Sequence, residues 1–241
     1  MATTHGAHPA GGNGGSPTRV VADAPVQQWT KSGPITGTLP TAEVTRLQEF
    51  QEVTAAQPAP LGLFGFATGT IAIGFVLSGF TAMSAQIGTA PVLLIFAGIA
   101  QFIATMWAYR RSNAFAATAF GAYGANNMVV ATFFLLSAAG VIPKNFDTNV
   151  TLSIELFSFG FISLVFAVAA VRLNPVFVGL LAALVPGFCL AGLGLLGEPM
   201  TIGNVGGYFL ILSAVLAFYA AAALVVNAAF RRTVLPLFGR A

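Results

Sequence analysis

The side chains that could do chemistry in the long apolar part of this chain are amides and phenols rather than charged groups. An amide or a hydroxyl in hydrocarbon needs a hydrogen-bond partner or water. The side chains of this kind are Gln101, Tyr123, Asn126, Asn127, Tyr219 and Asn227. A hydrogen bond between helices explains any one of them, but several together favour a narrow, mostly apolar passage with few donors. Such a passage suits a small solute that is neutral or weakly hydrated.

Ionisable side chains, which mark proton relays and ion pathways inside membranes, are scarce in the same region. The charged residues between positions 61 and 230 are Arg110, Arg111, Lys144, Asp147, Glu155, Arg172 and Glu198. Glu155 comes closest to the interior, and we expect it to be an exposed carboxylate at the outer interface. Both histidines, His5 and His8, precede the apolar region. No metal-ligand set and no G-x-S-x-G motif lies in the apolar runs, so nothing indicates an enzyme, a metal site or a cofactor.

The composition is that of a membrane protein. Of the 241 residues, 56% are hydrophobic and 7% are charged, whereas about a quarter of the residues in soluble domains are charged. The mean hydropathy is +0.84. The net charge of +3 does not indicate a nucleic-acid partner, because Arg110 and Arg231 lie at the ends of apolar runs. Cys189 is the single cysteine, which excludes a disulfide framework and a thiolate metal site.

Six apolar runs are each long enough to cross a bilayer, for which about 20 residues suffice. They span roughly 61–83, 88–109, 114–139, 151–171, 176–197 and 204–229. Polar or proline-containing breaks separate them. The sequence therefore predicts an all-α membrane protein built as a bundle of six transmembrane helices.

The distribution of lysine and arginine predicts the orientation of this bundle. With an even number of spans, both termini share one side of the membrane. The cations expected on that side are Arg19, Lys31, Arg46, Arg110, Arg111, Arg172, Arg231, Arg232 and Arg240. The other side holds only Lys144. Because cytoplasmic loops are the ones enriched in lysine and arginine, we expect a multi-pass protein of the cell membrane with cytoplasmic N- and C-termini.

The N-terminal segment, residues 1–56, has a different composition. It is rich in Gly, Pro, Ala, Thr and Ser up to about residue 40, and too little apolar surface remains to offset the cost of ordering, so we expect a disordered cytoplasmic tail. Apolar residues three apart in the stretch 41–53 fit a short amphipathic helix on the membrane surface or a fraying linker. The first apolar run starts near residue 60 and is too long for a signal peptide. Residues 57–241 form the predicted membrane domain.

Glycine and proline shape the predicted spans. Gly65 and Gly69 have the GxxxG spacing that lets membrane helices approach closely. Pro186, in the middle of the fifth span, predicts a kink. Ordinary tight packing accounts for most of these residues.

Three stretches of the chain resemble one known family. The heptad QPAPLGL resembles the N-P-A-P-L-G-L signature of the acetate uptake transporters, also called succinate–acetate permeases. The signature residues here are Gln57, Pro58, Ala59, Pro60, Leu61, Gly62 and Leu63. The stretches IAQFIATMWAYRRSNAFAATAFGAYG (99–124) and NAAFRRTVLPLFG (227–239) resemble the family's second and third helices and its C-terminal motif. The resemblance covers residues 57–239.

The resemblance implies a six-helix protomer that transports acetate and related short carboxylates together with protons. It also implies a homo-hexamer in membrane lipid, with one pathway in each protomer. In the family a Phe, a Tyr and a Leu form the narrowest point, which carries over to Phe66, Tyr123 and Leu184. Gln101 and Asn227 fall on a glutamine and an asparagine of the family's motifs, and we expect both to support solute contacts.

Two departures from the family pattern bear on the predicted site. Gln57 replaces the asparagine of the signature, and a capping role at the first span would weaken because the two amides differ in reach. Asn126 and Asn127 stand where the family has an aromatic pair. They make this part of the third span more polar, so a larger or more hydrated carboxylate is compatible with it.

Three hypotheses therefore remain open. The first is a proton-coupled transporter of acetate-like carboxylates. The second keeps the fold but makes the protein a passive acid or anion channel, because no buried carboxylate is evident as a proton carrier. The third is a non-transporting membrane protein that binds partners through residues 1–56. Collapsing the proton gradient separates the first two, and deleting the tail tests the third.

Overall fold

The computed structural model describes Ala42 and residues 56–143, 147–197 and 200–239. The chain divides into two units, Met1–Val44 and Thr45–Ala241. Apart from Ala42 and Ala56, the predicted tail and the amphipathic helix expected near 41–53 lie outside the described residues. The helical bundle belongs to the second unit.

Six helices of the described residues are long and apolar enough to cross a membrane, as the sequence predicts. They are α2 (Ala59–Leu77), the combined segment Gln86–Arg110, α5 (Ala114–Ala138), α6 (Thr148–Ala170), α7 (Pro175–Leu195) and α8 (Met200–Phe230). A short 3₁₀ turn, η2 (Met83–Ala85), precedes the second of them. The described part of the chain contains no strand. The predicted all-α, six-span fold is confirmed.

Side-chain caps start three of the six spans. Asn113 accepts a hydrogen bond from the Ala116 N–H, 3.0 Å away, and begins α5. Asp147 caps α6 by accepting from the backbone N–H groups of Asn149 and Val150. Asn174 caps α7, whose first residue is a proline. These short polar side chains satisfy N–H groups that have no partner inside the helix, and they explain why the spans begin where they do.

The first span, α2, begins differently. Pro58 is its N-cap and no side chain caps it, so Gln57 is not the capping group that the signature suggested. The helix ends at Leu77, earlier than the expected boundary near residue 83. Gly79 follows with a φ of +80°, a left-handed conformation that glycine adopts without strain. The apolar run continues beyond this point, but the helix does not.

The second span changes its helical type along its length. It consists of α3 (Gln86–Pro91), the π-helical segment η3 (Val92–Ile99) and α4 (Ala100–Arg110). Pro91 lies inside it and has no N–H to donate. A wider turn such as the π-helix accommodates a break of this kind in the hydrogen-bond ladder. The sequence predicted one continuous run here.

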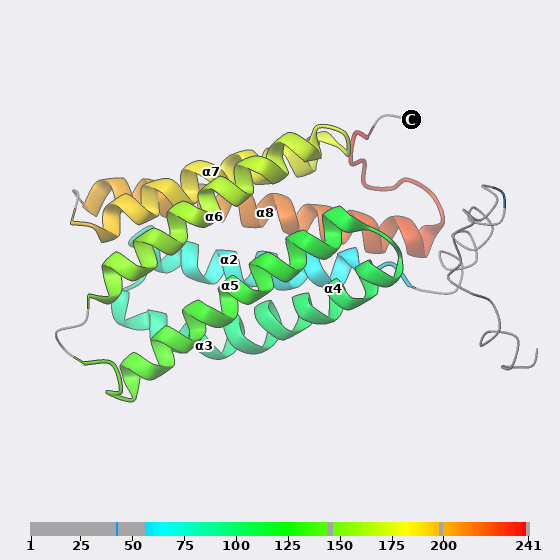
Figure 1. Ribbon diagram of the computed structural model, residues 1–241. Helices are drawn as coiled ribbons and strands as arrows, with labels where there is room; N and C mark the ends of the chain where they lie inside the picture. Colours follow the sequence, from blue (N-terminus) through cyan, green and yellow to red (C-terminus); the bar gives the residue numbers. More distant parts are fainter. Residues whose placement is uncertain (1–41, 43–55, 144–146, 198–199, 240–241) are drawn as a thin grey trace, which may run out of the picture. The chain divides into compact units, whose positions relative to one another are not determined.

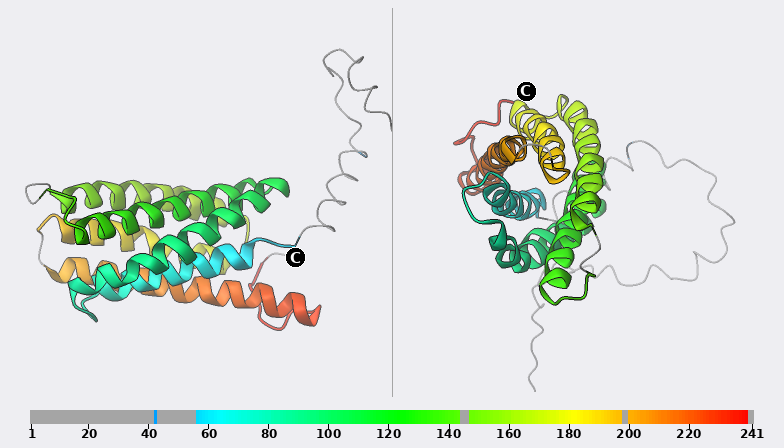
Figure 2. Two further views of the ribbon diagram at one scale, coloured as in Figure 1. Left: turned by 90° about the horizontal axis from the view of Figure 1, so that it is seen from below. Right: turned by 90° about the vertical axis from the view of Figure 1, so that its left-hand side faces the viewer.

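The spans alternate in direction and pack around a common centre (Figures 1 and 2). Helix α8 packs on α2 and α7, and α6 packs on α7. On the other side, α2 packs on η3 and α4, which pack in turn on α5. Glycines allow the approach of α2 to η3, because a methyl group at Gly65 would lie 2.9 Å from the Phe96 carbonyl oxygen. The helices α2, α5, α6 and α7 thereby face one another across the bundle.

Candidate functional site

Two aromatic side chains, Phe66 and Tyr123, meet inside the bundle. They come from α2 and α5, and their ring centroids lie 5.2 Å apart. Each side chain is 4% exposed. The rings of Phe159, Phe166 and Phe188 also surround Tyr123, at centroid distances of 6.0, 5.9 and 6.5 Å. Aromatic contacts of this kind hold a ring in a defined position, so the Phe66–Tyr123 pair forms a firm apolar layer.

One cavity lies on each side of this layer. The near cavity, of about 210 Å³, lies at the end of the bundle where α2 begins, and Gln57, Asn113, Asn174 and Leu237 are among its lining residues. The far cavity, of about 130 Å³, lies toward the end where α2 stops. Phe66 and Tyr123 line both cavities. Each cavity volume is larger than the roughly 10–15 Å³ that one water molecule needs. The pair therefore separates two spaces large enough for a small solute.

Leu184, the third residue expected at the narrowest point, takes a different position. It is fully buried and packs in the same apolar cluster as Phe66 and Tyr123, but it is not among the residues that line either cavity. From the same helix, Leu180 and Leu181 line the near cavity and Phe188 lines the far one. Leu184 thus supports the layer from behind, while its neighbours one turn away face the cavities.

The hydroxyl of Tyr123 is already engaged by α6. It lies 2.8 Å from the Oγ of Ser163, whose own hydroxyl donates to the Phe159 carbonyl oxygen over 2.6 Å. Because the Ser163 hydroxyl donates its hydrogen to the backbone, Tyr123 is the donor in the bond between Tyr123 and Ser163. The Tyr123 proton is therefore directed at α6 and is not free to meet a solute.

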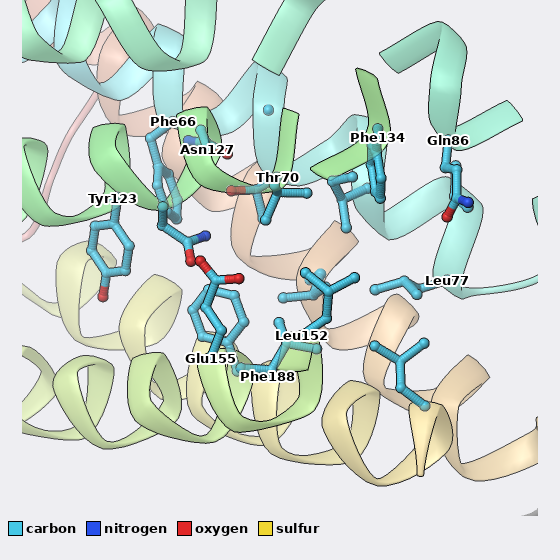
Figure 3. Close-up of a pocket in the computed structure, with 18 of the residues that line it drawn as sticks. Phe66, Thr70, Leu77, Gln86, Tyr123, Asn127, Phe134, Leu152, Glu155 and Phe188 are labelled. Carbon is cyan, nitrogen blue, oxygen red and sulfur yellow. The ribbon is translucent and has the colours of Figure 1, made fainter. Parts of the chain in front are cut away.

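Polar side chains from several helices line the far cavity, and Figure 3 shows Thr70, Asn127 and Glu155 among them. They are Thr70, Gln86, Asn126, Asn127, Asn149 and Glu155. In Figure 3 the carboxyl group of Glu155 reaches from α6 toward Thr70 on α2. Among the residues that the structure describes, no lysine, arginine or histidine lines either cavity. The far cavity is thus polar without being cationic.

Glu155 was expected to be an exposed carboxylate at the outer interface, but the structure shows it half-buried in the wall of the far cavity. The residue lies two turns into α6, is half-buried and lines the far cavity. Asn149, Leu152 and Leu156 line the same cavity, and their spacing from Glu155 places all four on one helical face. That periodicity was a signal the sequence contained, but α6 is apolar on its other faces too, so the inward face did not stand out.

Gln101 and Asn127 form a buried amide pair between the second and third spans. The Asn127 Nδ2 donates to the Gln101 Oε1 over 3.0 Å. Gln101 is fully buried against two glycines, since methyl groups at Gly65 and Gly124 would lie 3.2 and 3.0 Å from its side chain. Gln101 does not line either cavity. It positions Asn127, which does line the far cavity.

The neighbouring Asn126 is in a different situation. Its side chain is 8% exposed and lines the far cavity. Its Oδ1 is buried and has no hydrogen-bond partner. A buried amide oxygen without a donor costs roughly 1–3 kcal/mol. Asn126 is therefore an acceptor that lacks its donor.

Asn227 lies away from both cavities and binds the C-terminal segment instead. Its Oδ1 accepts from the N–H groups of Val234 and Leu235 at 2.7 and 2.9 Å. Its Nδ2 donates to the Leu235 carbonyl oxygen over 2.8 Å. This folds the segment back so that Leu237 lines the near cavity. The structure thus connects Asn227 to the near cavity only through the chain that it holds.

A bundle of six apolar spans with one cavity on each side of an aromatic pair is the architecture of a multi-pass membrane protein. The chain belongs to the GPR1/FUN34/yaaH family, whose sequence pattern matches residues 38–238. The resemblance noted from the three sequence stretches is confirmed.

Named relatives of this chain come from a bacterium and a fungus. The chain is 28% identical over 182 residues to the succinate-acetate/proton symporter SatP of Escherichia coli, covering 76% of this chain and 95% of that protein. It is 29% identical to acetate permease A of Emericella nidulans, covering 76% and 65% of the two chains. A solved structure of the bacterial acetate channel SatP superimposes with a TM-score of 0.71 at 27% identity, covering 76% of this chain and 99% of that one. These relatives are transporters or channels.

Proposed function

We propose that this protein moves acetate and related short-chain carboxylates across a cell membrane. The observation that carries the proposal is the Phe66–Tyr123 layer between two cavities of solute size. The names of its relatives, a succinate-acetate symporter, an acetate permease and an acetate channel, supply the substrate class. The pathway runs through the near cavity, past this pair, and into the far cavity of each protomer.

The chemistry of the layer restricts what can pass. A carboxylate that enters between two aromatic rings loses water, and burying an uncompensated charge is costly. The described lining of the cavities offers no cation to replace that water. The undissociated acid, or an anion passing with a proton, meets a far smaller barrier. This favours small monocarboxylates over multiply charged solutes.

The orientation, assembly and domain division of the transporter are part of the same proposal. The excess of arginine and lysine near the end of the bundle that holds the near cavity supports a cytoplasmic location for both termini. The near cavity then opens to the cytoplasm and the far cavity to the outside. Residues 57–241 are the transport domain, residues 1–56 a cytoplasmic tail, and the protomers assemble in the lipid as a hexamer.

Proton-coupled transport is the leading mechanism, and a passive acid or anion channel is the second candidate. The relatives support both, since one is named a proton symporter and a solved one a channel. Collapsing the proton gradient abolishes accumulation by a symporter but leaves flux through a channel that acetate itself drives. Measuring labelled acetate uptake with and without a protonophore distinguishes the two.

The test of the function itself is uptake of labelled acetate by cells that lack their own acetate transporters. Cells that express this chain should take up acetate faster than cells with an empty vector. Competition by a series of unlabelled carboxylates then defines the substrate range. Uptake equal to that of the empty vector, with the protein demonstrated in the membrane, would exclude the proposal.

A further inference from the structure

The far cavity combines two hydrogen-bond acceptors that have no donor. One is the Glu155 carboxyl group, which makes no hydrogen bond or ion pair with the described residues. The other is the Asn126 Oδ1, which is buried and without a partner. Asn126 is more than nine-tenths buried, at 8% exposed. Two acceptors in the lining of one small cavity favour a ligand that carries a hydrogen-bond donor, such as a protonated acid.

No neighbouring group supplies that proton or neutralises the carboxylate. The helices α2, α3, α5, α7 and α8 also line this cavity, and the only other titratable side chain they contribute is Tyr123 from α5. The Tyr123 proton is donated to Ser163. Cys189, from α7, lies against Gly160, farther along α6, and is not among the lining residues. The charge of Glu155 is therefore uncompensated within the described cavity.

We propose that the far cavity is a binding site for a small monocarboxylic acid together with one proton, built by Glu155 and Asn126. The inference rests on the proposed function and assigns the recognition step to these two residues. The proton lies between the carboxyl groups of the acid and of Glu155. The amide of Asn126 donates an N–H to the acid's other oxygen, and its Oδ1 is the alternative acceptor for the same single proton.

Electrostatics and hydrogen bonding both support this arrangement. Two carboxylates a few ångströms apart in a partly dry site cannot both stay ionised, so they share a proton. An amide pairs with a carboxyl group through one N–H donor and one C=O acceptor. The same site rejects the bare anion, because Glu155 repels it and no cation is present. The selection of the protonated form thus takes place in the far cavity, next to the aromatic layer.

The experiment measures proton uptake when acetate binds. The full chain in lipid nanodiscs is titrated with acetate by calorimetry in buffers of different ionisation enthalpy, at a pH where both free acetate and the Glu155 carboxyl group of the unliganded protein are ionised. We expect about one proton to be taken up per acetate bound, because the two carboxyl groups share it. Above that pH the affinity should fall by about tenfold per pH unit, as linkage to one proton requires.

Three variants identify the residues involved. In Glu155→Gln the stoichiometry should fall to near zero, whereas Glu155→Asp, which keeps a carboxyl group, should retain about one proton per acetate. Asn126→Ala should weaken acetate binding several-fold, by about the 1 kcal/mol of one hydrogen bond, with the stoichiometry unchanged. Ser158→Ala is the matched control, because this exposed residue of α6 donates only to the Ile154 carbonyl oxygen of its own helix.

The outcomes separate this inference from the proposed function. A wild-type protein that neither binds nor takes up acetate fails the proposed function. Acetate binding without proton uptake, or with the same uptake in Glu155→Gln, overturns only the inference. If Glu155→Gln does not bind acetate but Glu155→Asp binds it with uptake of one proton, the inference is supported. If neither variant binds acetate, the inference is overturned.

Discussion

At the residue scale, Phe66 separates the two cavities with one ring from α2. The ring packs against Tyr123 and borders both spaces. In the proposed pathway, the size of this side chain, rather than a specific hydrogen bond, would set the width. A smaller residue should join the cavities.

Phe66→Ala is thus expected to admit larger acids. The rate of labelled butyrate uptake relative to acetate should rise roughly tenfold, the effect of lowering a barrier by about 1.4 kcal/mol. Phe64→Ala is the control, since Phe64 lies on the same helix, packs on Phe218 with centroids 6.2 Å apart and lines neither cavity. A butyrate-to-acetate ratio like that of the wild type, with folded protein, would contradict this account of Phe66.

Gln101 and Asn127 differ from Phe66 because a specific hydrogen bond joins them. The stability of the folded protein therefore depends on each having its partner. Asn127→Leu leaves the buried Gln101 Oε1 without a donor, which should cost roughly 1–3 kcal/mol of unfolding free energy. Changing both residues to Leu removes the orphaned group, so the double variant should lose less than the sum of the single losses. Thermal unfolding in nanodiscs measures this, and strictly additive losses would mean that the pair is not coupled.

At the scale of the element, the C-terminal segment is held by one side chain of α8. Asn227 makes three hydrogen bonds to it, and Tyr219 makes one to the Pro236 carbonyl oxygen. The segment has no regular structure of its own, so its position depends on these bonds. It completes the wall of the near cavity through Leu237.

Asn227→Ala should therefore release the segment. The amides of Val234 and Leu235 lose their acceptor, so we expect them to exchange hydrogen at least about tenfold faster, as loss of about 1.4 kcal/mol of protection requires. Hydrogen–deuterium exchange measures this directly. Tyr219→Phe removes a single bond and should have a smaller effect, and unchanged exchange in Asn227→Ala would exclude the clamping role.

At the scale of the whole molecule, alternating spans place every second connection on the same side of the membrane. Both ends of α5 are exposed at Ala114 and Ala139, which gives a matched pair of positions on one helix. The excess of cations near the α4–α5 turn predicts that this turn is cytoplasmic.

Single cysteines at these two positions, in a Cys189→Ala background, test the orientation. An impermeant thiol reagent added to intact cells should label Ala139→Cys, whereas Ala114→Cys should react only after permeabilisation. The reverse pattern would place both termini outside. Wild-type protein, whose only cysteine is the half-buried Cys189, serves as the background control.

Properties that depend on a contiguous stretch of chain were predictable from the amino-acid sequence alone. The six spans follow from local hydropathy, and the family follows from three short motifs, because neither depends on which face of a helix turns inward. Phe66 and Tyr123 were found through those motifs, and the structure places them in contact.

Only the tertiary structure decided which faces meet. Leu184 was assigned through the family resemblance, whereas packing turned Leu180, Leu181 and Phe188 of the same helix toward the cavities. Glu155 reads as an interfacial carboxylate until α2 and α5 enclose a cavity in front of it. The apolar residues of a transmembrane helix can face either lipid or protein. The sequence of one helix therefore does not show which of its faces packs against another helix. Long-range packing between spans far apart in the sequence makes that choice.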